Sequence, residues 1–319
     1  MREFAAVAGV APNGHTLTLP PALGQGQLQA FALQPGFELI THHYTLRAPL
    51  TLHRRPAVPR TDLVCILCYL NEVPIVQRYA GANAALSRPA AAGITLSTDD
   101  MGGSFHFPLH TEIFVGILTV RLAVLRELLG PDAQPELLAR IQAGEQSFYV
   151  YEDADPDILA VLRQLREPPA RAPLALLYCR AKAQELLYLF FARLARRPHQ
   201  ALPAPRPDDV RRLMQARARL LADLARPPAL AALAAGAGLS ETRLKTLFRQ
   251  VFGLSVYSYF QQARMAEARR LLQNPALSVA DVGERLGFTN LSHFARLFRT
   301  AAGTTPKKFA KAQAAAGLG

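Results

Sequence analysis

Residues 287–306 of the chain read GFTNLSHFARLFRTAAGTTP, and residues 238–256 read GLSETRLKTLFRQVFGLSV. The two stretches align at an offset of 50 residues along their helical parts and of 49 at their turns, so the second copy carries one extra residue. Self-similarity of this kind indicates a duplicated structural unit. Each copy holds a glycine, Gly238 or Gly287, that can adopt a left-handed backbone conformation, followed by residues able to cap a helix. A short apolar helix, a tight turn and a longer helix make a helix-turn-helix, and the sequence predicts two of them in tandem.

The ends of these helices follow from apolar spacing and capping residues. One helix is predicted between the two units, with Tyr259, Phe260 and Met265 able to pack on both. Such a connector would fix the distance between the second helices of the units, and a distance near ~34 Å would let both enter successive major grooves of DNA. The predicted features are supporting helices over 230–237 and 279–286, caps at Ser240 and at Thr289 or Asn290, and a connector over 256–273.

The second helix of each unit separates its side chains by face, because positions three, four and seven apart project together. Leucine and phenylalanine fill one face and are predicted to anchor the helix. The opposite face carries mainly donors for DNA phosphates and base edges. Any one of these residues alone would more often lie on a solvated helix face, but the duplicated set favours DNA recognition. The outward residues are Thr242, Lys245, Thr246 and Arg249 in the first helix, and Leu291, Ser292, His293, Arg296 and Arg299 in the second.

Three stretches carry a resemblance to a known family. They are LSETRLKTLFRQVFG at 239–253, ARMAEARRLL at 263–272 and SVADVGERLGFTNLSHFARLFRTAAGTTPKKF at 278–309. They resemble the AraC/XylS family of transcription regulators, and the similarity extends from about residue 208 to 309. It implies two three-helix units joined by a shared helix. It further implies base reading by Thr242, Lys245, Thr246, Leu291, Ser292, His293 and Arg296, and phosphate contacts by Arg249 and Arg299.

Two further stretches resemble one branch of that family. They are CRAKAQELLYLFFARL at 179–194 and PPALAALAAGAGL at 227–239, and they look like the branch that includes pyochelin-responsive regulators of siderophore genes. This resemblance implies a siderophore as the effector. The front half of the chain is similar to the family in plan only, so no pocket residue is carried over to it.

The charge of the chain suits a polyanionic partner. Lysine and arginine number 36 against 24 acidic residues, which gives a net charge of +12 and favours nucleic acid or an anionic membrane surface. Residues 227–319 hold 12 basic and 4 acidic side chains, a net of +8, so the excess lies at the C-terminal end. Charge alone leaves solvated helix faces as an equal alternative. No segment approaches the ~18 consecutive apolar residues needed to span a bilayer, and no membrane partner is expected.

The length of 319 residues predicts two domains. From residue 37 to about 120, apolar and β-branched runs are broken by Gly, Pro and Asn, which predicts the strands of a cupin-like barrel or a sandwich. From residue 121 the apolar spacing becomes helical. The predicted strands are 37–46, 63–70, 94–97 and 113–120, and the predicted helical segments are 122–129, 137–141, 158–165, 174–194 and 208–224.

The segment 174–194 has a broad apolar face, which is predicted either to cover its own β domain or to join two subunits. The proline-rich stretch RRPHQALPAPRP at 196–207 is the best linker candidate. The predicted fold class is α+β. It comprises a β-rich effector-binding and dimerisation domain with a helical tail over 1–200, a linker over 201–207, and an all-α double helix-turn-helix domain over 208–319.

Side chains suited to catalysis or metal binding occur without convergent spacing. Cys65 and Cys68 lie three residues apart, so on a strand they would face opposite ways, and three cysteines cannot build a four-thiolate zinc site. We interpret these cysteines, and the histidines of the β-rich half, as structural residues. No metal or cofactor is expected. The histidines are His42, His43, His53, His106 and His110.

These patterns predict a cytoplasmic, sequence-specific DNA-binding transcription regulator without enzyme activity. The family resemblance favours activation and contact with RNA polymerase. The expected partners are double-stranded promoter DNA, a small-molecule effector bound by the N-terminal domain, and a second copy of the chain. Two alternatives remain open. One is an architectural DNA binder without sequence preference, and the other is a metal- or thiol-dependent enzyme or DNA repair protein fused to an AraC-like DNA-binding domain.

Overall fold

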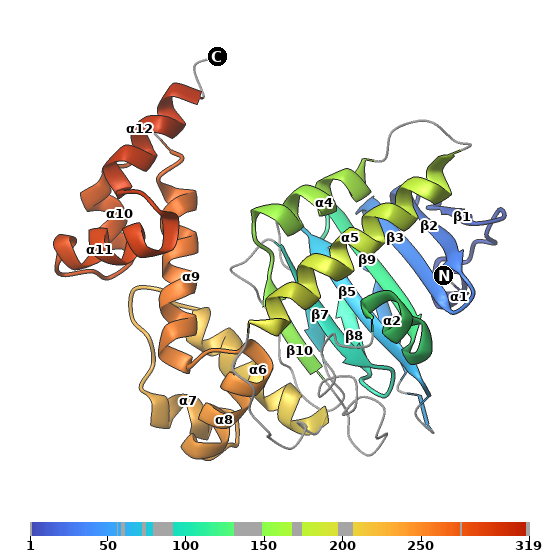
Figure 1. The fold of residues 1–319 in the computed structure, drawn as a ribbon, viewed down its shortest axis with the longest axis horizontal. Helices are drawn as coiled ribbons and strands as arrows, with labels where there is room; N and C mark the ends of the chain where they lie inside the picture. The colour runs from blue at the N-terminus through green and yellow to red at the C-terminus, as the bar shows by residue number, and fades with distance from the viewer. Residues whose placement is uncertain are drawn as a thin grey trace. The chain divides into compact units, whose positions relative to one another are not determined.

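The computed structural model describes residues 2–55, 57–58, 61–71, 75–78, 92–130, 149–167, 174–196, 207–274 and 276–316 (Figure 1). These residues form two compact units, which are described separately. The N-terminal unit is rich in strands and contains most of residues 2–211, and the C-terminal unit is helical and contains most of residues 212–316.

Two antiparallel sheets form the framework of the N-terminal unit. The larger has the strand order β1-β2-β3-β9-β5-β7-β10, and the smaller has the order β4-β8-β6. The strands are β1 (Thr16–Thr18), β2 (Gly24–Gln34), β3 (Phe37–Leu46), β4 (Thr51–Arg54), β5 (Leu63–Leu70), β6 (Val76–Arg78), β7 (Ala92–Thr98), β8 (Gly103–His106), β9 (Glu112–Arg121) and β10 (Tyr149–Asp153). The helices are α1 (Arg2–Ala8), α2 (Leu122–Leu129), α4 (Pro156–Arg166) and α5 (Ala175–Ala195).

The strands predicted from the sequence agree with four strands of the larger sheet. β3 and β5 have the predicted ends, and β7 and β9 extend one or two residues beyond the predicted ones. β2 and β10 are not predicted. β2 begins GQGQLQ, where glycine and glutamine hide the apolar alternation, and β10 ends in acidic residues at the edge of the sheet, inside a region where helical spacing was expected.

Each face of the seven-stranded sheet has its own apolar core, because successive residues of a strand point to opposite sides. The first core lies under helices α2, α4 and α5 and includes Phe114 of β9 and Phe190 of α5 (Figure 1). The second core, on the other face, includes Tyr44 of β3 and Phe4 of α1. Leu52 of β4 packs against it, so the smaller sheet contributes to the second core.

Helix α5 mainly covers its own sheet. Leu187, Phe190, Phe191 and Leu194 are all buried in the first core. Leu177 is instead 63% exposed. Most of the apolar face of this segment therefore fits the covering role, and Leu177 remains on the surface.

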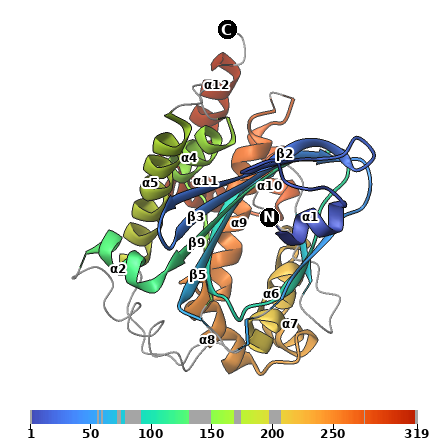
Figure 2. The same ribbon diagram turned by 90° about the vertical axis from the view of Figure 1, so that its right-hand side faces the viewer.

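The C-terminal unit consists of seven helices among the described residues. In both views, α9 runs between the pair α7 and α8 and the pair α10 and α11 (Figures 1 and 2). Phe294 and Phe298 of α11 are fully buried and form a core with Met265 of α9 and Val282 of α10. The helices are α6 (Pro207–Leu221), α7 (Leu230–Gly236), α8 (Glu241–Phe252), α9 (Val256–Leu271), α10 (Val279–Arg285), α11 (Leu291–Ala302) and α12 (Pro306–Ala316).

The predicted fold class is confirmed: a β-rich part with a helical tail precedes an all-helical pair of helix-turn-helix units. Helix α6 ends earlier than predicted. Asp223 accepts hydrogen bonds from the backbone N–H groups of Ala225 and Arg226 at 2.8 and 3.1 Å, forming a turn, and Pro227 follows. The predicted helix 137–141 and residues 197–206 of the expected linker lie outside the described residues. None of the helices described here is long and apolar enough to cross a membrane.

Candidate functional site

The first helix-turn-helix consists of α7 and α8. Gly238 lies between them with a φ of 65°, in the left-handed region where glycine carries no steric penalty. Leu239 N–H donates to the carbonyl of Ala234 at 3.0 Å, which closes the turn. The Ser240 hydroxyl accepts from the backbone N–H of Arg243 at 3.2 Å, so it caps α8 as predicted.

The second unit consists of α10 and α11 and has a stricter turn. Gly287 has a φ of 74°, and a Cβ atom there would lie 2.2 Å from the carbonyl oxygen of Ala225. Only glycine fits at this position. Of the two candidate caps it is Asn290 that serves, because its side-chain oxygen accepts from the backbone N–H of His293 at 3.0 Å.

Helix α8 exposes the predicted polar face. Lys245 approaches Glu241 at 3.8 Å, a loose pair between exposed side chains that contributes little to stability. Within the described part of the chain, the Arg249 guanidinium has no hydrogen-bond or ion-pair partner. Thr242, Lys245 and Arg249 are exposed and Thr246 is half-buried, while Leu244, Leu247 and Phe248 anchor the helix at 0% exposure.

Helix α11 has the same arrangement around its buried phenylalanines. Leu291 is 45% exposed near the start of the helix, and Ser292 beside it is exposed. His293 is half-buried, and its ring packs edge-on against Phe288 with centroids 6.0 Å apart. Arg296 and Arg299 are exposed, and no described residue pairs with either guanidinium. Unpaired cations on a capped helix are available to a polyanion.

A buried arginine joins the connector helix to the second unit. Arg264 of α9 is 7% exposed, and its guanidinium lies 3.6 Å from the ring centroid of Phe288. The same group donates a hydrogen bond to the backbone carbonyl of Leu286, immediately before the Gly287 turn. Burial lowers the pKa of Arg264 from its ordinary value, because a desolvated cation is disfavoured. Arg264 thus ties α9 to the turn that positions α11.

A second buried arginine has the equivalent place in the first unit. Arg217 of α6 is 2% exposed, and its Nε atom lies 2.5 Å from the hydroxyl oxygen of Tyr259 on α9. Its guanidinium also lies 5.4 Å from the centre of the same ring. An arginine and an aromatic ring therefore attach α9 to α6, as another such pair attaches α9 to the second helix-turn-helix unit.

Two buried polar side chains, His42 and Tyr44, lie in the second core of the N-terminal unit, and a third, Asn71, is buried after the end of β5. His42, Tyr44 and Asn71 are 5%, 2% and 4% exposed. Among the described residues, none provides a hydrogen-bond partner for His42 Nδ1, Tyr44 Oη or Asn71 Nδ2. Burial lowers the pKa of His42 to about 3 and raises that of Tyr44, so both side chains are neutral at pH 7. Buried polar atoms without partners cost stability, and each calls for an explanation such as a ligand.

His42 and Tyr44 share one face of the sheet by strand register. His42 and Tyr44 alternate on β3, and their cross-strand partners on β9 are Val115 and Ile113, which lie in the same core. Asn71 follows the end of β5, and its side-chain oxygen accepts from the backbone N–H of Phe114 at 2.7 Å. Its amide nitrogen is the atom left unpaired.

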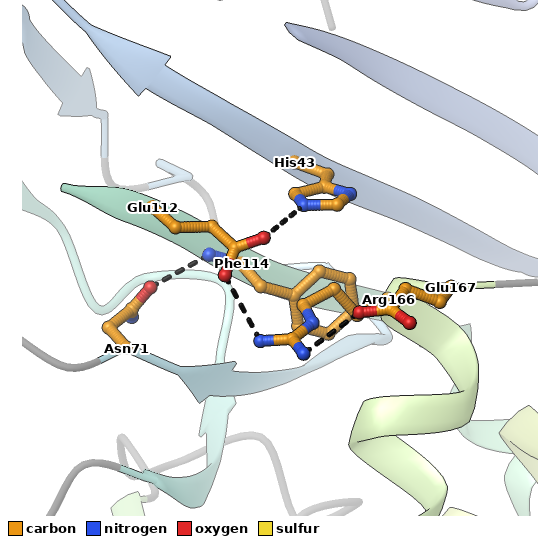
Figure 3. A network of polar contacts seen from close by, with 6 residues as sticks. All are labelled: His43, Asn71, Glu112, Phe114, Arg166 and Glu167. Carbon is orange, nitrogen blue, oxygen red and sulfur yellow. Dashed lines mark hydrogen bonds and ion pairs between the residues drawn. The ribbon is translucent and has the colours of Figure 1, made fainter.

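The opposite face of the sheet carries a paired network (Figure 3). His43 Nε2 lies 2.8 Å from one oxygen of Glu112, whose other oxygen lies 3.2 Å from Arg166 of α4. Arg166 also contacts Glu167 at 2.9 Å. These contacts join β3, β9 and the end of α4, which is a structural role.

His53, His106 and the cysteines also have structural surroundings. His53 hydrogen-bonds Ser104, and His106 hydrogen-bonds Thr51, each at 3.0 Å between strands of the smaller sheet. Burial raises the pKa of the Cys68 thiol to about 12, so this thiol is not a ready nucleophile. In the described parts of the chain, no three metal-ligating side chains gather at one place. All three cysteines, Cys65, Cys68 and Cys179, are buried and free.

Sequence reasoning missed the buried arginines and the polar cluster of the second core. Arg264 lies four residues after Phe260 and one before Met265, both buried, so its position on an apolar helix face was a usable signal. The pairing of His42 with Tyr44 was visible as strand alternation. Their place opposite Val115 and Ile113 in the second core depends on long-range strand pairing, which no local pattern reveals.

Comparison with known proteins agrees with this geometry. The profile of the regulatory protein PchR N-terminal domain matches residues 25–206, and that of a helix-turn-helix domain matches residues 233–312. The transcriptional activator NphR of Rhodococcus sp. is 42% identical over 88 residues, 28% of this chain and 26% of its own length. The arabinose operon regulatory protein of Escherichia coli is 36% identical over 80 residues, 25% of this chain and 27% of its own. The chain thus matches about a quarter of the length of these relatives.

A solved structure of an AraC-type transcriptional regulator from Chromobacterium violaceum is 28% identical and covers 32% of this chain and 92% of its own, with a TM-score of 0.31. Tandem helix-turn-helix units after a regulatory domain define the class of protein: a DNA-binding transcription regulator with an N-terminal regulatory domain. Since the regulatory-domain profile spans more than half of the chain and a helix-turn-helix profile follows it, the chain belongs to the AraC/XylS family.

Proposed function

We propose that the chain is an effector-controlled transcription activator that reads promoter DNA with α8 and α11. Thr242, Lys245, Thr246, Leu291, Ser292, His293 and Arg296 contact base edges, and Arg249 and Arg299 contact phosphates. The observation that carries this proposal is that both helices, each capped and anchored by leucine or phenylalanine, present unpaired arginines on the opposite face. Arginine on a helix in the major groove can donate two hydrogen bonds to guanine.

Footprinting of the full-length protein on its own promoter region tests this proposal. Each subunit is expected to protect about two helical turns of DNA, because two recognition helices on one connector reach successive major grooves. A homodimer would double the protected length. Equal protection of unrelated sequences would instead identify an architectural DNA binder and contradict the proposal.

The effector binds the second core of the N-terminal unit, around His42 and Tyr44. Support comes from their buried, unpartnered polar atoms, for which a ligand would supply the missing hydrogen bonds. Phe4 of α1 packs against His42 and Tyr44, with ring centroids 5.8 and 5.6 Å away, and would have to make room. A siderophore is the effector that the resemblance to pyochelin-responsive regulators favours, and the match to the PchR N-terminal domain agrees with it.

Replacing Tyr44 with phenylalanine separates a ligand contact from a packing role. Removing a buried hydroxyl that lacks a partner should leave thermal stability unchanged or raise it. The loss of one hydrogen bond should weaken effector binding about three- to tenfold. Calorimetric titration with ferric pyochelin measures affinity, and mass spectrometry of co-purified small molecules offers candidates if that probe does not bind. Equal affinity of wild type and variant for a bound effector would place the effector elsewhere.

The remaining parts of the proposal follow from the same assignment. Residues 1–200 form the effector and dimerisation domain, 201–207 the linker and 208–319 the DNA-binding domain. The exposed residues Leu174, Leu177 and Tyr188 on and next to α5 form the dimer contact. A regulator of this kind acts on RNA polymerase at the promoter, in the cytoplasm.

A further inference from the structure

A pocket of about 370 Å³ lies within the first helix-turn-helix unit. It is enclosed by the end of α6, the start of α7, one side of α8 and the first turns of α9. Its floor and walls are mainly apolar and include Leu220, Leu230, Val256 and Phe260, with Tyr257 at the rim, where it is 66% exposed. The volume is within the range of small-molecule sites, about 300–1,000 Å³.

All the charged residues that line the pocket are cationic. Lys245 and Arg249 both contribute to its wall, one helical turn apart on α8, and no acidic side chain among the described residues lines it. The Arg249 guanidinium has no partner in the described parts of the chain, and Lys245 has only the 3.8 Å contact to Glu241. An apolar hollow with two available cations on one side matches an organic anion with an apolar body.

The second unit of the repeat does not repeat these residues. At the offset of 50, Lys245 corresponds to Ala295, Tyr257 to Lys307 and Phe260 to Ala310, whereas Arg249 corresponds to Arg299. The arginine is therefore common to both units, while the second cation and both aromatic rings belong to the first unit alone. The residues that make the pocket are thus not required by the helix-turn-helix fold.

We propose that this pocket binds a small organic anion, an aromatic or aliphatic carboxylate or sulfonate, and that this anion and DNA exclude each other. The anionic group pairs with Lys245 and Arg249, and the apolar body occupies the space between Leu230, Val256 and Phe260. The anion and DNA exclude each other because the same two cations face DNA in the proposed function, so the exclusion rests on that function. The binding of the anion to the pocket does not depend on the proposed function.

Two matched probes test the chemistry. The first is 8-anilinonaphthalene-1-sulfonate, whose emission rises on burial, and the second is N-phenyl-1-naphthylamine, which has the same rings without the sulfonate. The full-length protein should bind the sulfonate about tenfold more tightly than the amine, since a charge-assisted contact is the difference between them. Equal affinity for the two probes would overturn the assignment of Lys245 and Arg249 as the anion site.

Two variants identify the pocket as the place of binding. Leu230→Trp fills it and Tyr257→Ala removes its exposed wall, and each should lower sulfonate affinity at least about fivefold. Val58→Ala is the control, because Val58 is likewise an exposed apolar residue, at 87%, but lies in the other unit, outside the proposed dimer contact. Circular dichroism establishes that each variant is folded. Unchanged affinity in both folded pocket variants, or an equal loss in the control, would overturn the proposal.

Displacement by DNA separates the inference from the proposed function. A duplex carrying the footprinted site should release the sulfonate, and Leu230→Trp should keep its DNA affinity while becoming insensitive to the probe. If the protein selects its DNA site but the bound sulfonate remains, the exclusion is wrong and the proposed function stands. If the pocket variants abolish probe binding but no DNA sequence is selected, the pocket stands and the proposed function fails.

Discussion

Replacing Arg264 with alanine is expected to destabilise the second helix-turn-helix unit by about 2–3 kcal/mol, because a desolvated cation–π contact and a charged hydrogen bond are lost together. The guanidinium stacks 3.6 Å from the centre of the Phe288 ring and donates to the carbonyl of Leu286. Without it, that carbonyl loses a partner and the turn at Gly287 loses its attachment to α9. Hydrogen exchange of the full-length protein should show faster exchange in α10 and α11 than in α7 and α8.

Arg270 provides the matched control for this prediction. It lies on the same helix, but its side chain is 67% exposed and pairs with Glu267 at 2.6 Å. Exposed ion pairs of this kind contribute about 0–1 kcal/mol to stability. The backbone amides of α10 and α11 in Arg270→Ala should therefore exchange almost as slowly as in the wild type. Equal protection of α11 in the two variants would mean that Arg264 does not hold the second unit.

Two further substitutions separate charge from packing at this position. Arg264→Lys keeps the charge but loses the planar group that stacks on Phe288, so it should remain destabilising. Arg264→Met keeps much of the apolar volume and removes the Nε atom that has no partner among the described residues. A methionine variant as stable as the wild type would show that packing alone holds the unit together, because replacing a buried charge by an apolar residue can be neutral.

The parts of the fold that the sequence predicts well are those set by neighbours in the chain. Gly238 and Gly287 take left-handed conformations, and Ser240 and Asn290 cap the helices that follow. These features depend on residues at most five positions apart, so local patterns identify them. The duplication then distinguishes two tandem helix-turn-helix units from a single motif that matches by chance.

The parts that escape prediction depend on contacts between distant segments. Arg264 contacts Phe288, which lies 24 positions later in the sequence, and the residues around Arg264 do not indicate which ring its guanidinium will contact. The polar cluster of the N-terminal unit depends on the register of β3 with β9, far apart in the sequence. A composition of apolar and β-branched runs predicts strands, but it does not assign neighbours to them.

Replacing Arg296 with alanine is expected to weaken binding to the cognate promoter site by about 1–3 kcal/mol, or roughly five- to 150-fold, through the loss of a bidentate contact to one base. The residue is exposed on α11, and no described residue competes for its guanidinium. The reduction should be confined to sites carrying the preferred base, so preference at that one position should disappear. Fluorescence anisotropy with duplexes substituted at each position measures this pattern.

Arg299 is the natural comparison because it lies one helical turn further along the same helix and is equally unpaired. As a phosphate contact, its replacement by alanine should weaken binding to all sequences alike and reduce the slope of log affinity against log salt by about one. Arg296→Lys keeps the positive charge but cannot present the planar pair of donors, so it should bind DNA while losing the base preference. If Arg296→Ala instead lowers affinity equally for every sequence, Arg296 contacts the backbone and base selection by α11 depends on Leu291, Ser292 and His293.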